Sequence, residues 1–214
     1  MPSSGRDLSR PLTVVNRFTV KGDTRRFERQ FRPHCDYLRQ QRGFNFLVTG
    51  QLIDRPNVYM HFSHWVTHQA FLRVVHHDAF LSHVQGLSPI VEVEADQAVS
   101  LGRLLVDEAR QGAENVVFIQ ALVDEGRPLT DFEWQFHELF GHCAAGEGFG
   151  GGDVMRSTLA PQKYLAVCWW RDGESCQRAM AEPGFLQRVG QLKSVARIST
   201  ERLRHLTYAP GVSR

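Results

Sequence analysis

The hydrophobic pattern of the first half of the chain changes between the two-residue period of strands and the 3.6-residue period of helices. After a first strand-like run, Phe27, Phe31 and Leu38 fall on one helical stripe, and Gly43 suits the end of that helix. Two more strand-like runs are joined by "DRPN", whose Asp and Pro favour a turn, and a helical stretch broken before Ala79 precedes a last strand. The pattern predicts β-α-β-β-α-β, with strands at 12–20, 44–53, 58–65 and 90–101 and the broken helix at 68–77 and 79–87.

The second half repeats this pattern at a fixed offset of 105 residues. "FERQF" at 27–31 recurs as "FEWQF" at 132–136, and the same offset carries Trp65 onto Trp170 without a gap. We interpret the chain as a tandem duplication with its boundary near 102–114. The second copy predicts strands at 115–123, 151–159, 163–170 and 196–208, a helix over about 129–145, and another helix before the last strand.

Each copy has the element order of a ferredoxin-like fold. A sheet of this kind carries helices on one face only, so its other face needs cover. Two copies in one chain can supply that cover by packing sheet against sheet. We therefore expect an α+β protein in which two ferredoxin-like repeats, at 11–102 and 114–208, pack as an intramolecular dimeric α+β barrel.

A glycine-rich segment, "GEGFGGG" at 146–152, contains the G-x-G-x-x-G pattern of dinucleotide-binding loops. That pattern binds a pyrophosphate only where it follows a strand and opens a helix. Here the glycines follow a predicted helix and precede a predicted strand, which is the reverse order. We interpret the segment as a helix-to-strand connection with a bulged strand start, and we expect no nucleotide there.

The composition narrows the class of protein. The chain has 214 residues, 42% of them hydrophobic, and a net charge of +2, which gives no electrostatic reason to expect nucleic acid or an anionic membrane as a partner. The polar opening "MPSSGRDLSR" lacks the apolar core of a signal peptide, and no apolar run approaches membrane-spanning length. The four cysteines form no C-x-x-C pair, which favours reduced thiols. We expect a cytoplasmic monomer or homodimer.

Reactive side chains are concentrated in the first copy, which we therefore predict to be the catalytic half. Under the offset, Asn16, His61 and His76 all meet alanines of the second copy, which we interpret as a structural or lid-forming half. Seven of the ten histidines lie in the first copy: His34, His61, His64, His68, His76, His77 and His83.

Two metal-binding patterns fit the sequence poorly. His137 and His142 of "HELFGH" are five residues apart, whereas the zinc motif H-E-x-x-H needs a spacing of four to put both ligands on one helix face. "HHD" at 76–78 could seed an iron site with two histidines and one carboxylate, but only if the helix breaks there, because residues two apart point in different directions. We expect no bound metal.

With the repeat and these residues, the chain resembles the antibiotic biosynthesis monooxygenase superfamily of dimeric α+β barrels, fused here in tandem. The resemblance is carried by "VVNRFTVKGD", "YLRQQRGFNFLV", "DRPNVYMHFSHW", "HHDAFLSHV" and, in the second copy, "WWRD". Within that group, "VVNRFTVKGD" and "VEVEADQAVS" look most like the oxygenases that open the B ring of angucycline polyketides of the jadomycin, gilvocarcin and kinamycin type. The resemblance implies O2-dependent oxidative C–C cleavage of a polycyclic phenol or quinone.

The resemblance also implies site residues. In quinone-forming anthrone oxygenases of the superfamily, an Asn of the first strand and a Trp at a strand end line the pocket, and Asn16 and Trp65 match them; the pocket Arg of those enzymes has no match after the second helix. We expect Asn16 and His61 to stabilise the developing oxyanion and peroxide, and His61 or His76 to move the proton. The expected substrate-binding residues are Tyr59, His64, Trp65 and His83.

Each assignment has a structural alternative. Asn16 could bond a neighbouring backbone group. His61 shares strand parity with Tyr59 and Trp65, and it could be a satisfied, half-buried histidine. Tyr59 and Trp65 recur in the second copy, which favours packing.

No dinucleotide fold is visible, so we expect no tightly bound cofactor. O2 would be the co-substrate, and reduced flavin (FADH2 or FMNH2), if the reaction needs it, would come from a separate flavin reductase. Three alternatives stay open: a quinone-forming anthrone-type monooxygenase, a haem-degrading monooxygenase, whose pattern Asn16, Trp65 and His76 or His77 also fit, and a non-redox module that only binds or cyclises a polyketide.

Overall fold

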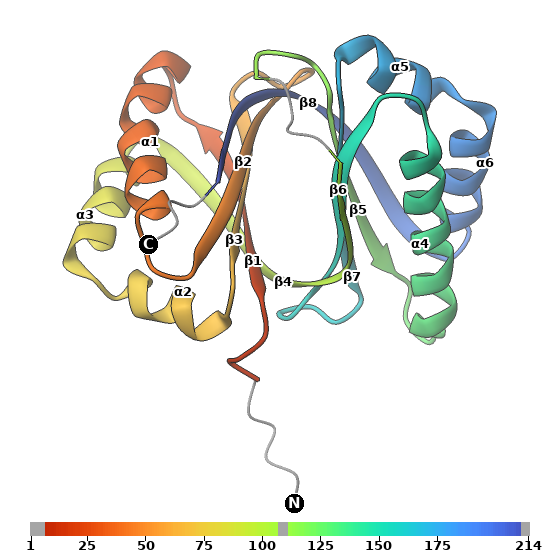
Figure 1. Ribbon diagram of the computed structural model, residues 1–214, viewed down its shortest axis with the longest axis horizontal. Coiled ribbons are helices and arrows are strands. Elements are labelled where there is room, and N and C mark those ends of the chain that lie inside the picture. The colour runs from red at the N-terminus through yellow and green to blue at the C-terminus, as the bar shows by residue number, and fades with distance from the viewer. Residues whose placement is uncertain (1–6, 107–110, 211–214) are drawn as a thin grey trace, which may run out of the picture.

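The computed structural model describes residues 7–106 and 111–210, which form two β-α-β-β-α-α-β repeats joined in one closed barrel (Figure 1). The expected α+β architecture of two tandem ferredoxin-like repeats is confirmed. Of the predicted boundary at 102–114, residues 107–110 lie outside the described residues. The repeat limits 11–102 and 114–208 stay a prediction.

The observed elements follow the predicted pattern. The first repeat consists of β1 (Leu12–Val20), α1 (Thr24–Arg39), β2 (Phe44–Leu52), β3 (Val58–Trp65), α2 (His68–Val75), α3 (Asp78–Leu87) and β4 (Val91–Leu105). The second consists of β5 (Val116–Val123), α4 (Leu129–Ala145), β6 (Phe149–Ser157), β7 (Lys163–Trp170), α5 (Gly173–Ala181), α6 (Pro183–Leu192) and β8 (Ala196–Pro210).

Several boundaries differ from the predicted ones, β6 by two residues at each end, and two of the differences have a physical reason. The helix break falls at residues 76–77 instead of before Ala79, and Asp78 occupies the first turn of α3, where a carboxylate is favoured by the helix dipole. β4 continues to Leu105, past the predicted end at 101, because its last part pairs with β6 of the second repeat. A pattern within one copy carries no signal of that pairing.

The barrel closes because the two repeats share strand pairs. Its order is β1-β3-β2-β8-β5-β7-β6-β4, so the edge strands β2 and β4 of the first repeat pair with β8 and β6 of the second. Ion pairs across the same boundary join Arg17 to Glu201 and Lys163 to Asp96, with N···O distances of 2.6 and 2.9 Å. The two repeats therefore form one cooperative unit through backbone and side chains alike.

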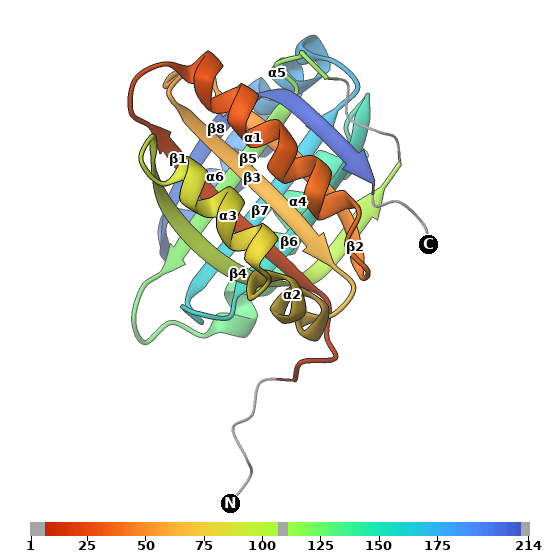
Figure 2. The ribbon, with the colours of Figure 1, turned by 90° about the vertical axis from the view of Figure 1, so that its left-hand side faces the viewer.

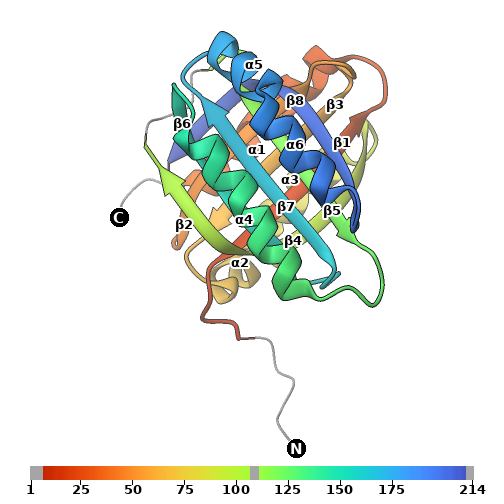
Figure 3. The same cartoon turned by 90° about the vertical axis from the view of Figure 1, so that its right-hand side faces the viewer.

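Helices cover the two outer sides of the barrel. Figure 2 shows α1, α2 and α3 lying across the strands of the first repeat, and Figure 3 shows α4, α5 and α6 on the opposite side. Each helical layer closes an apolar core against its own sheet, and a third apolar cluster fills the inside of the barrel. Among the helices of the described ranges, none has both the length and the apolar character needed to cross a bilayer.

Strand parity decides which layer each side chain of β3 enters. Tyr59 and Trp65 belong to the core under the helices of the first repeat, and Met60 and Phe62 belong to the cluster inside the barrel. His61 therefore points toward the helices.

The glycine-rich segment is a helix-to-strand connection, as the order of elements predicted. α4 ends at Ala145, β6 starts at Phe149, and the strand register shifts between Phe149 and Gly151, so the bulged start is present. The glycines make room for the neighbouring strand β7. A Cβ at Gly150 would lie 2.7 Å from the indole ring of Trp169, and one at Gly152 would lie 2.6 Å from the carbonyl oxygen of Val167.

Gly152→Ala is expected to lower the free energy of unfolding by about 1–3 kcal/mol, since the added methyl group overpacks a backbone contact that cannot shift cheaply. Gly141→Ala is the matched control. It lies on an exposed face of α4, its Cβ would meet nothing within 4 Å beyond its own helix in the described part of the chain, and it should gain up to about 1 kcal/mol. Urea denaturation of both variants measures the contrast. Equal stability of the two would contradict the packing role of Gly152.

Candidate functional site

A cavity of about 320 Å³ lies in the first repeat, between its sheet and its helices. Strands β1, β3 and β4 form one wall, and helices α1, α2 and α3 form the other. The lining is mostly aliphatic and aromatic, and none of the described residues that line it is an arginine or a lysine. The cavity lies at the lower end of the range of about 300–1,000 Å³ that is common for small-molecule sites.

Asn16 and Trp65 both line this cavity, from β1 and β3. The amide of Asn16 is half-buried and makes no side-chain hydrogen bond to a residue in the described ranges. The indole ring of Trp65 is buried and packs edge-on against Phe44, with ring centroids 5.2 Å apart. Its Nε1 has no acceptor among the residues placed by the structure. The indole nitrogen of Trp170 in the second repeat likewise lacks an acceptor among the described residues, so the amide of Asn16 is the donor that distinguishes the first repeat.

His61 lies opposite Asn16 on the neighbouring strand and lines the same cavity. Its ring is fully buried, and Nδ1 shares a hydrogen bond of 2.9 Å with Oγ1 of Thr49. Nε2 has no partner in the part of the chain that the structure describes. Burial lowers the pKa of His61 to about 3, helped by the neighbouring His34. His61 is therefore neutral at pH 7, with one free ring nitrogen, and that nitrogen is a donor or an acceptor according to the tautomer.

His34, on α1, is a site residue that the sequence interpretation missed. It lines the cavity, it is buried, and its Nδ1 lacks a hydrogen-bond partner within the described ranges. Burial lowers its pKa to about 4, with a smaller contribution from His83. The comparison of the two copies could have identified it, because the offset of 105 residues makes His34 correspond to the apolar Leu139.

Two expected substrate-binding residues lie outside the cavity. The hydroxyl of Tyr59 donates to Oε1 of Glu28 at 2.8 Å, and Tyr164 makes the equivalent bond to Glu133 at 2.7 Å, so this pair belongs to the duplicated scaffold. His64 stacks on Phe46, a residue of the cluster inside the barrel. The strand parity that points His61 toward the helices points His64 away from them. Neither Tyr59 nor His64 is part of the candidate site.

The histidines of the broken helix are also placed differently from the expectation. His76 is exposed at the end of α2 and does not line the cavity, because α2 ends at Val75 before the chain turns. Of the two histidines that we expected to move the proton, only His61 lines the cavity. His83, on α3, is half-buried behind the cavity wall, with its ring centroid 5.8 Å from that of His34.

The corresponding positions in the second repeat are apolar. Ala121, Ala166 and Leu139 take the positions of Asn16, His61 and His34, and all three are buried members of one apolar cluster.

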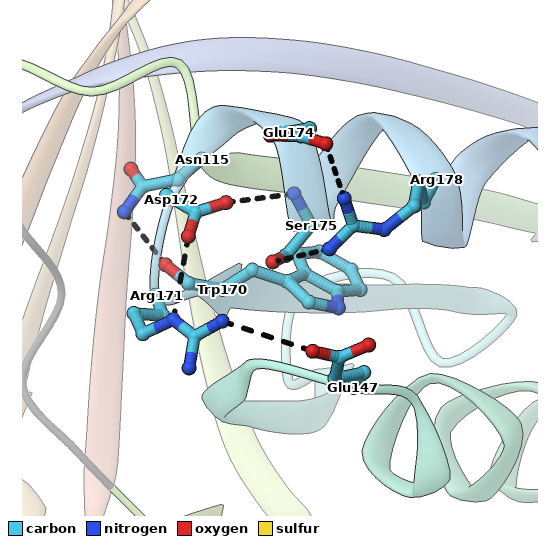
Figure 4. Close-up of polar contacts among 8 residues, drawn as sticks. All are labelled: Asn115, Glu147, Trp170, Arg171, Asp172, Glu174, Ser175 and Arg178. Carbon is cyan, nitrogen blue, oxygen red and sulfur yellow. Dashed lines mark hydrogen bonds and ion pairs between the residues drawn. The ribbon is translucent and has the colours of Figure 1, made fainter.

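The "WWRD" segment of the second copy has a structural role (Figure 4). The carboxylate of Asp172 accepts a bond of 2.8 Å from the backbone N–H of Ser175 and so caps α5. The amide of Asn115 donates to the backbone carbonyl of Trp170 at 2.7 Å, which ties the end of β7 to the start of the repeat. These contacts position the end of β7 and the start of α5.

Metal-ligating residues do not gather around the cavity. Within residues 7–106 and 111–210, no three side chains of His, Cys, Asp or Glu are arranged to hold a metal ion. Asp78 lies in the first turn of α3, after the helix break, and His76 and His77 before it are exposed.

The free energy of unfolding is expected to fall as pH is lowered from about 6.5 toward 4. His34 and His61 stay neutral in the folded protein because burial lowers their pKa values to about 4 and about 3, whereas the unfolded chain takes up protons near 6.5. Each such group contributes up to roughly 1.4 kcal/mol per pH unit in that window. His34→Leu installs the residue found at the equivalent position of the second repeat. It should remove the contribution of one histidine to the pH dependence of the free energy of unfolding. Urea denaturation at several pH values tests this, and an unchanged slope in the variant would contradict the assignment.

Comparisons with known proteins give two kinds of match. Residues 11–86 match the family model for antibiotic biosynthesis monooxygenases. Deoxynogalonate monooxygenase from Streptomyces nogalater is 34% identical over 76 residues, which are 36% of this chain and 64% of that enzyme. The match therefore spans somewhat less than two thirds of that relative.

Solved structures match nearly the whole chain. A candidate monooxygenase from Fusobacterium nucleatum is 12% identical, with 94% of this chain and 95% of that chain covered and a TM-score of 0.82. An anthrone oxidase-like protein is also 12% identical, with 95% and 94% covered and a TM-score of 0.72. At this identity the two structures show a shared tandem fold and no more.

Proposed function

We propose that this chain is an oxygenase of aromatic polyketides, since residues 11–86 match the family model for antibiotic biosynthesis monooxygenases. The observation that carries the proposal is the cavity of that domain, an apolar space whose wall presents polar groups without partners among the described residues: Asn16, His34, His61 and Trp65. Such a cavity suits a flat, multi-ring ligand with a few oxygen atoms. The name of the relative from S. nogalater, a monooxygenase of deoxynogalonate, supports the same class of reaction.

The reaction that we propose starts from the electronic state of O2. Ground-state O2 is a triplet and reacts readily only with a partner that gives single electrons, such as the phenolate or hydroquinone form of the substrate. Electron transfer and collapse of the resulting pair would form a peroxide on a ring carbon. Migration of a ring C–C bond to the near peroxide oxygen would then break the O–O bond and insert that oxygen into the ring, while the far oxygen leaves as hydroxide. Addition of this hydroxide, or of water, to the ring carbon left electron-deficient would give a hemiketal, and collapse of the hemiketal would break its bond to the inserted oxygen and open the ring.

The chain's contribution would be electrostatic. The amide N–H of Asn16 would donate to the oxyanion that develops on the substrate, and Nε2 of His61 would donate to the peroxide or accept the phenol proton, according to its tautomer. Because the cavity wall is largely apolar and His61 is fully buried, these interactions would be stronger than in water.

The proposed substrate is an angucycline-type phenol or quinone, and the proposed reaction is oxidative ring opening. The simple quinone-forming anthrone reaction is the second candidate, and the lack of an arginine or lysine among the described lining residues argues against it, because the resemblance implies a pocket Arg there. The haem-degrading alternative is not proposed. It required His76 or His77 at the site, and both side chains are exposed and outside the cavity lining.

The test is the consumption of a tetracyclic angucyclinone by the purified chain, with and without O2 and with and without a reduced-flavin supply. The proposal expects an oxygenated, ring-opened product only in the aerobic reactions. Turnover without flavin would indicate that O2 alone suffices, and turnover only with flavin would place a flavin reductase beside the enzyme. Tight binding without turnover in either aerobic reaction would instead favour the non-enzymatic binding module.

A further inference from the structure

The mouth of the cavity has an apolar rim that the proposed chemistry does not use. Val84 of α3, Val93 of β4 and Leu159 all line the cavity, and their side chains are 42%, 51% and 52% exposed. A single exposed aliphatic side chain is ordinary, but here three from separate elements line one cavity. Leu159 belongs to the second repeat, in the connection between β6 and β7.

Leu159 is held at this rim by a set of hydrogen bonds that joins the two repeats. The hydroxyl of Ser157 donates to Asp96 of β4 at 2.7 Å and accepts the backbone N–H groups of Leu159 and Ala160 at 3.1 and 2.9 Å. The backbone N–H of Thr158 donates to the backbone carbonyl of Gln97 at 2.7 Å. Asp96 is also paired with Lys163, and both Asp96 and Ser157 are buried. These hydrogen bonds therefore fix the connection against β4 and hold the backbone of Leu159 at the mouth of the cavity.

The duplication shows that an apolar residue at this position is not required by the turn itself. Under the offset of 105 residues, Leu159 corresponds to Asp54, an exposed residue in the connection between β2 and β3. The same connection thus carries an exposed carboxylate in the first repeat and, in the second repeat, a leucine that lines the cavity.

We propose that Leu159 is a specificity-determining contact, through which the second repeat covers the outer end of a polycyclic substrate bound in the first. This inference rests on the proposed function, because it takes the ligand to be a flat multi-ring molecule. The cavity of about 320 Å³ lies at the lower end of the range for small-molecule sites, so we expect a four-ring compound to fill it and reach the rim and a three-ring compound to end deeper. Covering Leu159 then removes apolar surface from water on both partners.

The test compares two probes, 1,8-dihydroxyanthraquinone with three rings and an angucyclinone with four, by quenching of tryptophan fluorescence in the full-length chain. Leu159→Asp installs the residue of the first repeat at the same turn position, and it should raise the Kd of the four-ring probe by roughly tenfold or more. Leu159→Ala should raise it about three- to fivefold. Leu186→Asp is the matched control, because Leu186 is 57% exposed on α6 and does not line the cavity.

The outcomes separate this inference from the proposed function. Weakened binding of the four-ring probe in Leu159→Asp, with wild-type affinity in Leu186→Asp and a smaller effect on the three-ring probe, supports the inference. If the wild-type chain binds the four-ring probe tightly and Leu159→Asp changes its Kd by less than twofold, the inference is wrong and the proposed function stands. A wild-type chain that binds neither probe overturns both.

Discussion

Replacing Asn16 by alanine is expected to lower the turnover number roughly a hundred- to a thousandfold while the fold stays intact, the usual effect of removing one oxyanion donor. The side chain lines the cavity and forms no hydrogen bond within the described part of the protein, so its loss breaks no side-chain hydrogen bond. His61→Ala should approach the same range. It also removes the bond to Thr49, so its folding must be checked by circular dichroism.

Two comparisons make this prediction specific. Trp65→Phe keeps an aromatic wall and should mainly weaken substrate binding. His137→Ala and His142→Ala change histidines of the second repeat and should keep turnover within a few-fold of wild type, on the order of 1 kcal/mol or less in barrier. If turnover falls strongly in His137→Ala or His142→Ala but not in Asn16→Ala and His61→Ala, the active half has been assigned to the wrong repeat.

The second large effect concerns the barrel. A fragment of residues 11–102 is expected to self-associate or aggregate, because its edge strands β2 and β4 lose their partners β8 and β6. It would also expose its share of the barrel interior, which includes Phe46 and Phe62. Burying each such side chain is worth roughly 1.5–3 kcal/mol.

Size-exclusion chromatography with light scattering measures the state of the fragment. Co-expression with residues 114–208 is the control and should restore a one-to-one complex, because the strand pairs and the Arg17–Glu201 ion pair can then form between chains. A stable, monomeric fragment would contradict the account of the barrel.

The fold could be predicted from the sequence because the duplication gives each element twice. The strand at Leu12–Val20 and the helix at Leu129–Ala145 have their predicted bounds. What one copy cannot reveal is contact between copies. The extension of β4 to Leu105 depends on β6, and the bonds that hold Leu159 depend on Asp96.

The cavity is lined by some of the predicted site residues and not by others, and the differences have physical causes. The comparison of copies finds positions where chemistry differs, and Asn16 and His61 do line the cavity. The comparison does not show which way a side chain points. His76 is therefore among the predicted site residues, although it lies at an exposed helix end. His34 carried the same asymmetry and was overlooked.

Two further assignments conflicted with signals that the sequence already held. Tyr59 recurs as Tyr164, and both hydroxyls bind a helix glutamate, as duplicated scaffold residues do. His64 is three residues from His61 on one strand, so strand parity alone places it on the other face of the sheet.

The most direct measurement of the central claim is a single turnover of an angucyclinone under 18O2, with the product analysed by mass spectrometry. The account predicts that the wild-type product carries oxygen derived from O2, and that Asn16→Ala forms this product at least about a hundredfold more slowly. A product that forms equally well without O2, or that contains no 18O, would contradict the assignment of this cavity to an oxygenase.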